Sequence, residues 1–194
     1  MGSITSTDTS PYLAALAARV LLFDGAMGTA LQEVEPTIDQ FGGKRLEGWI
    51  DGLVLHSPDL IAAIHRSMLE AGADVVETCT FQSTRLRLEE WGQADRTLEL
   101  NRRAAELARS VCTEFATAAR PRFVAGSVGP TGYLPASSDP SLGNITFAAL
   151  VETFAEQCQG LIEGGVDLLI IETQQDLLET KSAIFGARRA FEVT

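Results

Sequence analysis

The chain has 194 residues, with 26 Asp or Glu against 15 Lys or Arg, which gives a formal net charge of −11 at pH 7. Hydrophobic residues make up 45% of the sequence, enough for a sizeable core, so a chain that is disordered throughout is excluded. The negative charge and the lack of a basic patch argue against a nucleic-acid partner. No apolar run reaches about 18 residues, so we expect no membrane segment.

The cysteines and the N-terminal segment bear on the compartment. Three cysteines at wide spacing predict no disulfide framework. The first residues are rich in Ser and Thr and lack the basic start and long apolar stretch of a secretory signal. We therefore expect a cytoplasmic protein.

Short apolar runs alternate with longer amphipathic segments, which is the pattern of repeated β-α units over a parallel sheet. Four runs are predicted to be strands: 20–23, 74–76, 123–125 and 166–171. Their nearly continuous apolar composition predicts that both faces of each strand are covered.

Four helices are predicted after these strands. The first begins at Pro58, after a residue suited to N-capping, and ends at Gly72. Apolar residues at spacings of three and four predict the second over 100–115 and the third over 147–161, and a fourth covers about 176–191. The predicted fold class is therefore α/β. Four β-α units are half of an eight-stranded barrel, which takes about 250 residues, so we expect a truncated chain.

Carboxylates end three of the four predicted strands, at Asp24, Glu77 and Glu172. In parallel α/β folds the chemistry lies at these carboxyl ends. A buried carboxylate is costly without a partner, so we expect a cationic group there, and the ammonium of an amino acid would serve. The alternative is that each carboxylate caps a helix or pairs with Lys or Arg. Three together favour a binding site.

Glycines follow the same strands. Gly25 and Gly28 could hold an anion with backbone N–H groups, but the spacing of a phosphate loop is missing. Pro130 interrupts the helix that a dinucleotide site would need after Gly126. A carboxylate fits these amides as well as a phosphate does, and a phosphate-binding barrel of another family stays a distant alternative.

The remaining reactive side chains are predicted to be structural. Cys112 and Cys158 lie on apolar helix faces and are expected to be inert core thiols, whereas Cys79 follows a strand inside the predicted site. His56 and His65 are expected to be structural histidines with satisfied hydrogen bonds. No ligand spacing for a metal is present, so no metal site is predicted.

Five segments together resemble the homocysteine S-methyltransferase family, most closely the N-terminal homocysteine-binding module of the cobalamin-dependent methionine synthases. They are LLFDGAMGTALQ at 21–32, the segment at 56–84 that contains ETCTF, RFVAGSVGPTG at 122–132, the segment at 142–173 and LLETKSAIFGARRAF at 177–191. The combination of DGAMGT, ETxTF and GSVGPTG is specific, whereas any one alone is not.

The resemblance implies a (β/α)8 barrel of the TIM type. Residues 20–194 would be the N-terminal half of this homocysteine-binding domain, after an N-terminal extension and leading helix over 1–19. In the family, zinc binds the homocysteine sulfur and lowers its pKa, so that a thiolate attacks the methyl group and gives methionine. In methionine synthase the donor is methylcobalamin, remethylated from methyltetrahydrofolate. The implied partners are the other half of the barrel and the folate and cobalamin modules.

The resemblance also implies site residues. Carried over by position, Asp24 and Glu172 lie near the homocysteine amino group. The substrate-binding set is Asp24, Gly25, Glu77, Thr78, Cys79, Ser127, Gly129 and Glu172. The three zinc-binding cysteines of the family lie beyond Thr194, so no metal ligand and no catalytic residue is assigned, and the fragment alone is expected to be inactive. Cys79 stands where the family commonly has Asn.

Two other functions stay open. A stand-alone homocysteine S-methyltransferase that uses S-methylmethionine or betaine would share this half of the barrel. A non-catalytic half-barrel would bind an amino acid or assemble with a second chain to complete eight strands.

Overall fold

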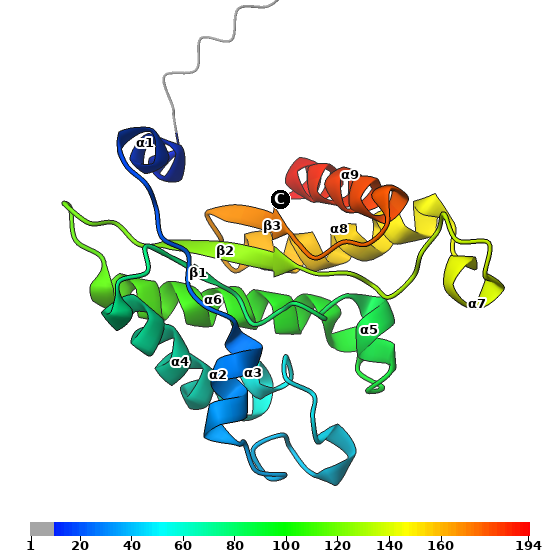
Figure 1. The fold of residues 1–194 in the computed structure, drawn as a ribbon, viewed down its shortest axis with the longest axis horizontal. Coiled ribbons are helices and arrows are strands. Elements are labelled where there is room, and N and C mark those ends of the chain that lie inside the picture. The colour runs from blue at the N-terminus through cyan, green and yellow to red at the C-terminus, as the bar shows by residue number, and fades with distance from the viewer. Residues whose placement is uncertain (1–9) are drawn as a thin grey trace, which may run out of the picture.

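The computed structural model describes residues 10–194 as a parallel three-stranded sheet with helices packed against it (Figure 1). The strands are β1 (Val75–Glu77), β2 (Phe123–Val128) and β3 (Leu168–Ile171), in the order β1-β2-β3. The helices are α1 (Pro11–Ala18), α2 (Met27–Val34), α3 (Leu53–His56), α4 (Pro58–Ala71), α5 (Arg85–Glu89), α6 (Thr97–Phe115), α7 (Pro140–Gly143), α8 (Phe147–Glu163) and α9 (Leu177–Val193), with 3-10 turns η1 (Lys44–Leu46) and η2 (Ala94–Arg96).

The four long helices agree with the sequence prediction, and their ends have local causes. Pro58 occupies the first turn of α4, and Gly72 ends it with a φ of 117°, a left-handed conformation that suits glycine. Helix α8 begins after Thr146, whose side chain accepts the N–H of Ala149. Asp176 caps α9 in the same way, through the N–H groups of the two residues after Leu177.

Side chains of the sheet alternate between two faces, as strand geometry requires. One face packs against the long helices: Val76 and Val124 meet α4 and α6, and Val128 meets α8 and α9. The other face carries an apolar row, packed against Tyr12 and Ala15 of α1, that comprises Val75, Phe123, Ala125, Leu168 and Ile170. Two residues further along each strand, the same face continues with Glu77, Ser127 and Glu172. The alternation therefore brings three polar side chains to one end of one face.

The first predicted strand is wrong. Over 20–23 only Phe23 forms a bridge, with Val75, so the sheet has three strands and not four. The N–H of Leu22 donates to the side chain of Asp74, at 3.1 Å to Oδ2, where a regular ladder would use a backbone oxygen. Val20 and Leu22, on one face of this segment, are 80% and 57% exposed, whereas Leu21 on the other face is buried against Val75 and Phe123, so only one face is covered.

The other strands differ from prediction at their ends. β2 continues to Val128, so Gly126 and Ser127 belong to the strand and not to the loop after it. β1 begins at Val75, and β3 at Leu168. β2 is buried along its whole length, as predicted, but all residues of β3 are only half-buried, because no described strand lies beyond it. The prediction of two covered faces therefore fails for β3.

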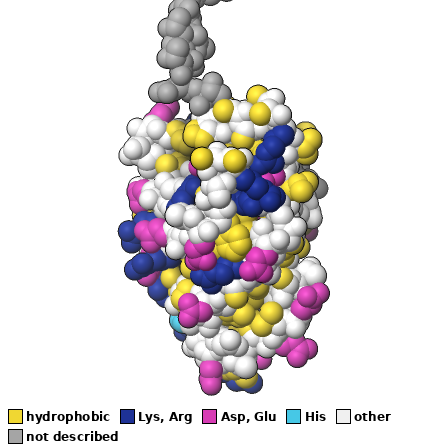
Figure 2. All heavy atoms as spheres, turned by 90° about the vertical axis from the view of Figure 1, so that its left-hand side faces the viewer, with side chains coloured by type: hydrophobic (Ala, Val, Ile, Leu, Met, Phe, Trp, Pro, Cys, Tyr) yellow, Lys and Arg dark blue, Asp and Glu magenta, His cyan; other side chains and the backbone are white. Residues whose placement is uncertain are grey.

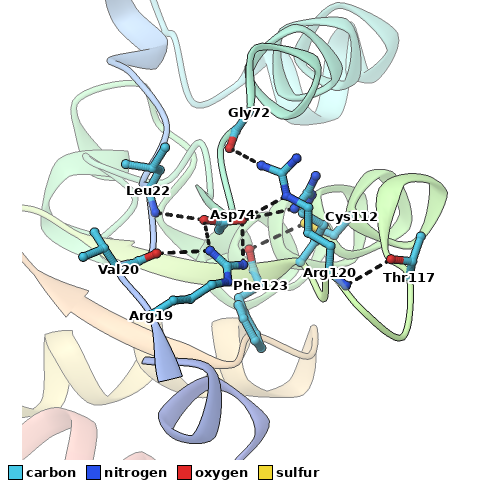
Figure 3. Close-up of polar contacts among 10 residues, drawn as sticks. Arg19, Val20, Leu22, Gly72, Asp74, Cys112, Thr117, Arg120 and Phe123 are labelled. Atoms are coloured by element: carbon cyan, nitrogen blue, oxygen red, sulfur yellow. Dashed lines mark hydrogen bonds and ion pairs between the residues drawn. The ribbon is translucent and has the colours of Figure 1, made fainter. Parts of the chain in front are cut away.

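A basic cluster closes the amino ends of the strands (Figure 3). The side chain of Asp74, just before β1, is 1% exposed and accepts both terminal nitrogens of Arg19, at 2.6 and 2.9 Å. Arg120 and Arg122 reach the same carboxylate at 3.4 and 3.1 Å. The view onto this end shows Lys and Arg side chains gathered there with hydrophobic side chains between them (Figure 2). We call Asp74 and these three arginines the arginine clasp.

Two further predictions concern the chain as a whole. Most of the predicted N-terminal extension, residues 1–9, lies outside the described residues, and the helix that follows it is α1. Within residues 10–194, no helix is both long enough and apolar enough to cross a membrane.

Candidate functional site

A cavity of about 560 Å³ opens at the carboxyl ends of the strands. It lies at the end of the sheet opposite the arginine clasp, between the strand ends and helix α2. Its walls come from five segments, which contribute Asp24, Gly25, Ala26, Met27 and Gly28; Ile50 and Asp51; Glu77, Thr78, Cys79, Thr80, Phe81 and Gln82; Ser127; and Glu172. Seven of the eight residues predicted to bind substrate are among them.

Two of the predicted carboxylates, those of Asp24 and Glu77, are neighbours in the lining of the cavity. Both oxygens of Asp24 accept the backbone N–H of Glu77, at 3.2 and 3.1 Å, so the segment after Phe23 is tied to the end of β1. Burial raises the pKa of Asp24 to about 7, against this hydrogen bond. The pKa of Glu77 is also raised to about 7, first by burial and then by the neighbouring carboxylates of Glu172 and Asp24.

Glu172 is held from β2. The hydroxyl of Ser127 donates to Oε1 of Glu172 at 2.6 Å, and the N–H of Glu172 donates to the carbonyl of Val128 at 3.1 Å. The carboxylate is thus held in the lining of the cavity, close enough to raise the pKa of Glu77.

The cavity holds acids without bases. Its described lining includes four carboxyl groups, with Asp51 as the fourth, and no Lys, Arg or His. Neither alternative for the three strand-end carboxylates, pairing with a basic side chain or capping a helix, appears in their hydrogen bonds. Carboxylates that crowd one another in a half-buried site favour a cation between them. The arrangement therefore suits a small organic ammonium group.

Buried hydroxyls fix the loop after β1. The hydroxyls of Thr78 and Thr80 lie 2.6 Å apart, and that of Thr80 donates to the carbonyl of Ser127 at 2.8 Å. The side-chain amide of Gln157, from α8, donates to the carbonyl of Thr80 at 2.9 Å. Gln157 is wholly buried and was not predicted, because it stands on a helix whose apolar rhythm indicates only packing.

Asp51 is an acidic residue of the cavity lining that the sequence analysis did not predict. Its Oδ2 accepts the N–H of Gln82 and the hydroxyl of Ser83, both at 2.7 Å, and its Oδ1 lies 3.9 Å from the sulfur of Cys79. Burial raises the pKa of Asp51 to about 6. The residue lies in a loop that follows no strand, so no strand-end signal marks it.

The glycines have different roles. Gly25 and Gly28 line the cavity at the start of α2, where Ala26 is the N-cap and makes no side-chain capping bond. The first N–H groups of this helix therefore have no side-chain cap from their N-cap residue in the described part of the chain. Gly129 is not part of the lining: a Cβ there would lie 2.3 Å from the carbonyl oxygen of Phe81, so it allows two loops to pack closely.

The cysteines remain free thiols in separate places. Cys112 and Cys158 are buried in α6 and α8, which confirms them as core residues. Cys79 is also buried, and burial and Asp51 raise the pKa of its thiol. Over residues 10–194, no group of three or more His, Cys, Asp or Glu side chains could hold a metal ion. These residues do not fit a zinc site, because no thiolate donors converge.

Comparison with known proteins gives consistent matches. Residues 21–193 match the sequence model of the family described as Homocysteine S-methyltransferase. The chain is 41% identical over 191 residues to the methionine synthase of Mycobacterium tuberculosis and 42% identical over 178 residues to that of Mycobacterium leprae. These matches cover 96% and 92% of the chain but only 15% and 14% of the two relatives.

A solved structure also matches. The metallated form of the homocysteine methyltransferase MmuM from Escherichia coli aligns with a TM-score of 0.74 and 24% identity, over 93% of this chain and 64% of that one. At this identity the match establishes a shared fold.

Proposed function

Because the chain belongs to the homocysteine S-methyltransferase family, we propose that it forms the amino-acid-binding half of a (β/α)8 barrel that methylates homocysteine on sulfur. The family match over 21–193 supports the reaction class, and the fold shared with a longer methyltransferase chain supports the completed barrel. The product of the proposed reaction is methionine.

One observation carries this proposal: three strand-end carboxylates meet in a cavity whose described lining has no basic residue. The ammonium group of homocysteine would lie among Asp24, Glu77 and Glu172 and relieve their mutual repulsion. Its carboxylate would meet the uncapped N–H groups at the start of α2, where the helix dipole favours negative charge. Together these contacts orient the amino acid by its two charges and leave the sulfur free to react.

Neither the zinc ligands nor the binding site of the methyl donor is assigned to the described residues. A bound zinc ion would supply a thiolate at neutral pH, as the family resemblance implies. The donors for it are not in the described residues, where the three cysteines are buried on separate elements. We propose that its cysteine ligands follow Thr194 in a longer protein, and that residues 10–194 alone bind substrate without methylating it.

Sequence identity favours the methionine synthase branch. The chain is 41% identical to a methionine synthase and 24% identical to the methyltransferase MmuM. We therefore propose methylcobalamin as the methyl donor, with methyltetrahydrofolate and the folate and cobalamin modules elsewhere in the protein. A stand-alone enzyme that uses S-methylmethionine or betaine is the second candidate, since the same cavity would serve it.

The test is a binding titration with L-homocysteine and with 4-mercaptobutanoate, which lacks only the amino group. At pH 7.5 calorimetry should detect binding of L-homocysteine and little or no binding of the analogue. The analogue has no ammonium group for the carboxylates to bind. Asp24→Asn should weaken the binding of L-homocysteine at least tenfold. Asp39→Asn, an exposed substitution outside the cavity, should leave the affinity unchanged. Equal binding of the two compounds, or no binding of either, would overturn the proposal.

A further inference from the structure

Thr173 has a backbone conformation that its residue type disfavours. Among the described residues only Glu35 and Thr173 have a positive φ without being glycine, at 51° and 57°. Glu35 ends α2, where a left-handed residue is a common cap. Thr173 instead follows β3, and threonine is β-branched, which makes this region a real outlier. Its side chain is exposed, so its own packing does not stabilise the conformation.

The residues on either side hold this turn against β2. The carbonyl oxygen of Val128 accepts the backbone N–H of Glu172 at 3.1 Å and the side-chain amide of Gln174 at 3.5 Å. One acceptor at the end of a buried strand thus anchors both neighbours of Thr173. A strained residue persists when its surroundings over-determine it, and such residues cluster at functional sites.

The turn decides where the Glu172 carboxylate lies. Glu172 continues the apolar row of β3 on the face that leads to the cavity, and the chain must then turn away to reach α9. The left-handed step at Thr173 makes this turn immediately after Glu172. The carboxylate is left with the hydroxyl of Ser127 at 2.6 Å on Oε1 and that of Thr173 at 3.4 Å on Oε2.

We propose that Thr173 is a positioning residue, whose left-handed turn and hydroxyl aim Glu172 at the ammonium group of the bound amino acid. This inference rests on the proposed function, because it assigns Glu172 to that ammonium. Strain next to a binding group keeps one orientation of the carboxylate populated before the ligand arrives, so less freedom is lost on binding.

The test replaces Thr173 with residues that accept a positive φ. In Thr173→Gly the strain disappears and the backbone gains other conformations, so the carboxylate of Glu172 becomes mobile. We expect the denaturation midpoint to stay level or rise while the dissociation constant for L-homocysteine increases about tenfold. Thr173→Asn, which tolerates the left-handed region, should restore most of the affinity. Glu35→Gly is the matched control: it changes the other non-glycine left-handed residue and should leave the dissociation constant unchanged.

Two results would overturn the proposal. One is wild-type affinity in Thr173→Gly; the other is a parallel loss of affinity and stability, which an ordinary structural role predicts. A wild-type protein that fails to bind L-homocysteine would refute the proposed function separately. The positioning role is then read from the side-chain carboxyl NMR resonance of Glu172 in the free protein at one fixed pH. Thr173→Gly should move or broaden this resonance and Glu35→Gly should not; an unchanged resonance in Thr173→Gly would refute the positioning role.

Discussion

The two ends of the sheet treat a buried carboxylate in opposite ways. At the amino ends, Asp74 is surrounded by three arginines and a backbone N–H, and the hydrogen bonds of Arg19 hold its pKa well below the usual range. At the carboxyl ends, Asp24 and Glu77 have no basic partner in the cavity, and burial raises both pKa values to about 7. The first arrangement is complete within the chain and stabilises the fold. The second is satisfied only when something else brings the positive charge.

The largest effect is expected from breaking the arginine clasp. Asp74→Ala leaves Arg122, which is nearly buried, without its partner, so the free energy of unfolding should fall by about 3 kcal/mol in urea denaturation. Because the pKa of Asp74 is lowered in the folded protein, its contribution to stability is present above about pH 4, the usual pKa of an aspartate, and is lost at more acid pH. Glu114→Ala, which breaks the exposed pair with Arg66, is the control and should change little. A similarly small decrease in the free energy of unfolding in both variants would show that the clasp does not stabilise the fold.

The opposite sign is expected in the cavity. A carboxyl group whose folded pKa is raised stabilises the fold below its usual pKa, and this contribution is lost as the pH rises to about 7. Asp24→Asn keeps an acceptor for the Glu77 N–H and removes the charge. It should therefore raise the free energy of unfolding at pH 8 by about 1 kcal/mol, after screening by water in the cavity. Asp39→Asn is again the comparison. A loss of stability in Asp24→Asn would mean that its charge is satisfied within the chain.

The smallest effect is expected at His65, a buried ionisable group at neither end. It is wholly buried in α4, burial lowers its pKa to about 4, and neither ring nitrogen has a hydrogen-bond partner among residues 10–194. The neutral ring contributes stability above about pH 6.5, and that stability is lost as the pH falls towards 4. His65→Leu should match the wild type within about 1 kcal/mol at pH 7. Thermal unfolding at pH 7 and pH 5 should show a smaller acid loss in the variant, and an equal loss would exclude His65 as the cause.

The sequence predicted the residues that line the cavity better than it predicted the strands of the sheet. The expectation that residues after the carboxyl ends of parallel strands meet brought Asp24, Glu77 and Glu172 together. It depends only on the direction of the strands and on the alternation of side chains along them. It holds for Asp24 although the segment before that residue forms only one bridge with the sheet. The ladder failed at Leu22 because the Asp74 side chain competes for its N–H, a contact between residues 52 positions apart that no local pattern contains.

Other features were beyond a reading of single segments. Asp51 follows no strand, and only the folded chain brings it to Gln82 and Ser83. The expectation that His65 has satisfied hydrogen bonds was wrong, because the helical position reveals burial but not partners. The turn at Thr173 could not be predicted either, since threonine is a poor indicator of a left-handed residue.

The arginine clasp also has a consequence for the lifetime of the folded chain. Its three arginines come from residues 19, 120 and 122, and they converge on a carboxylate at residue 74, so long stretches of chain must be in place before it can close. We therefore expect the clasp to form after the folding transition state, so that it slows unfolding more than it speeds refolding. Through Arg19, at the end of α1, the clasp should lower the rate at which the folded chain opens, and so lengthen the lifetime of the folded state.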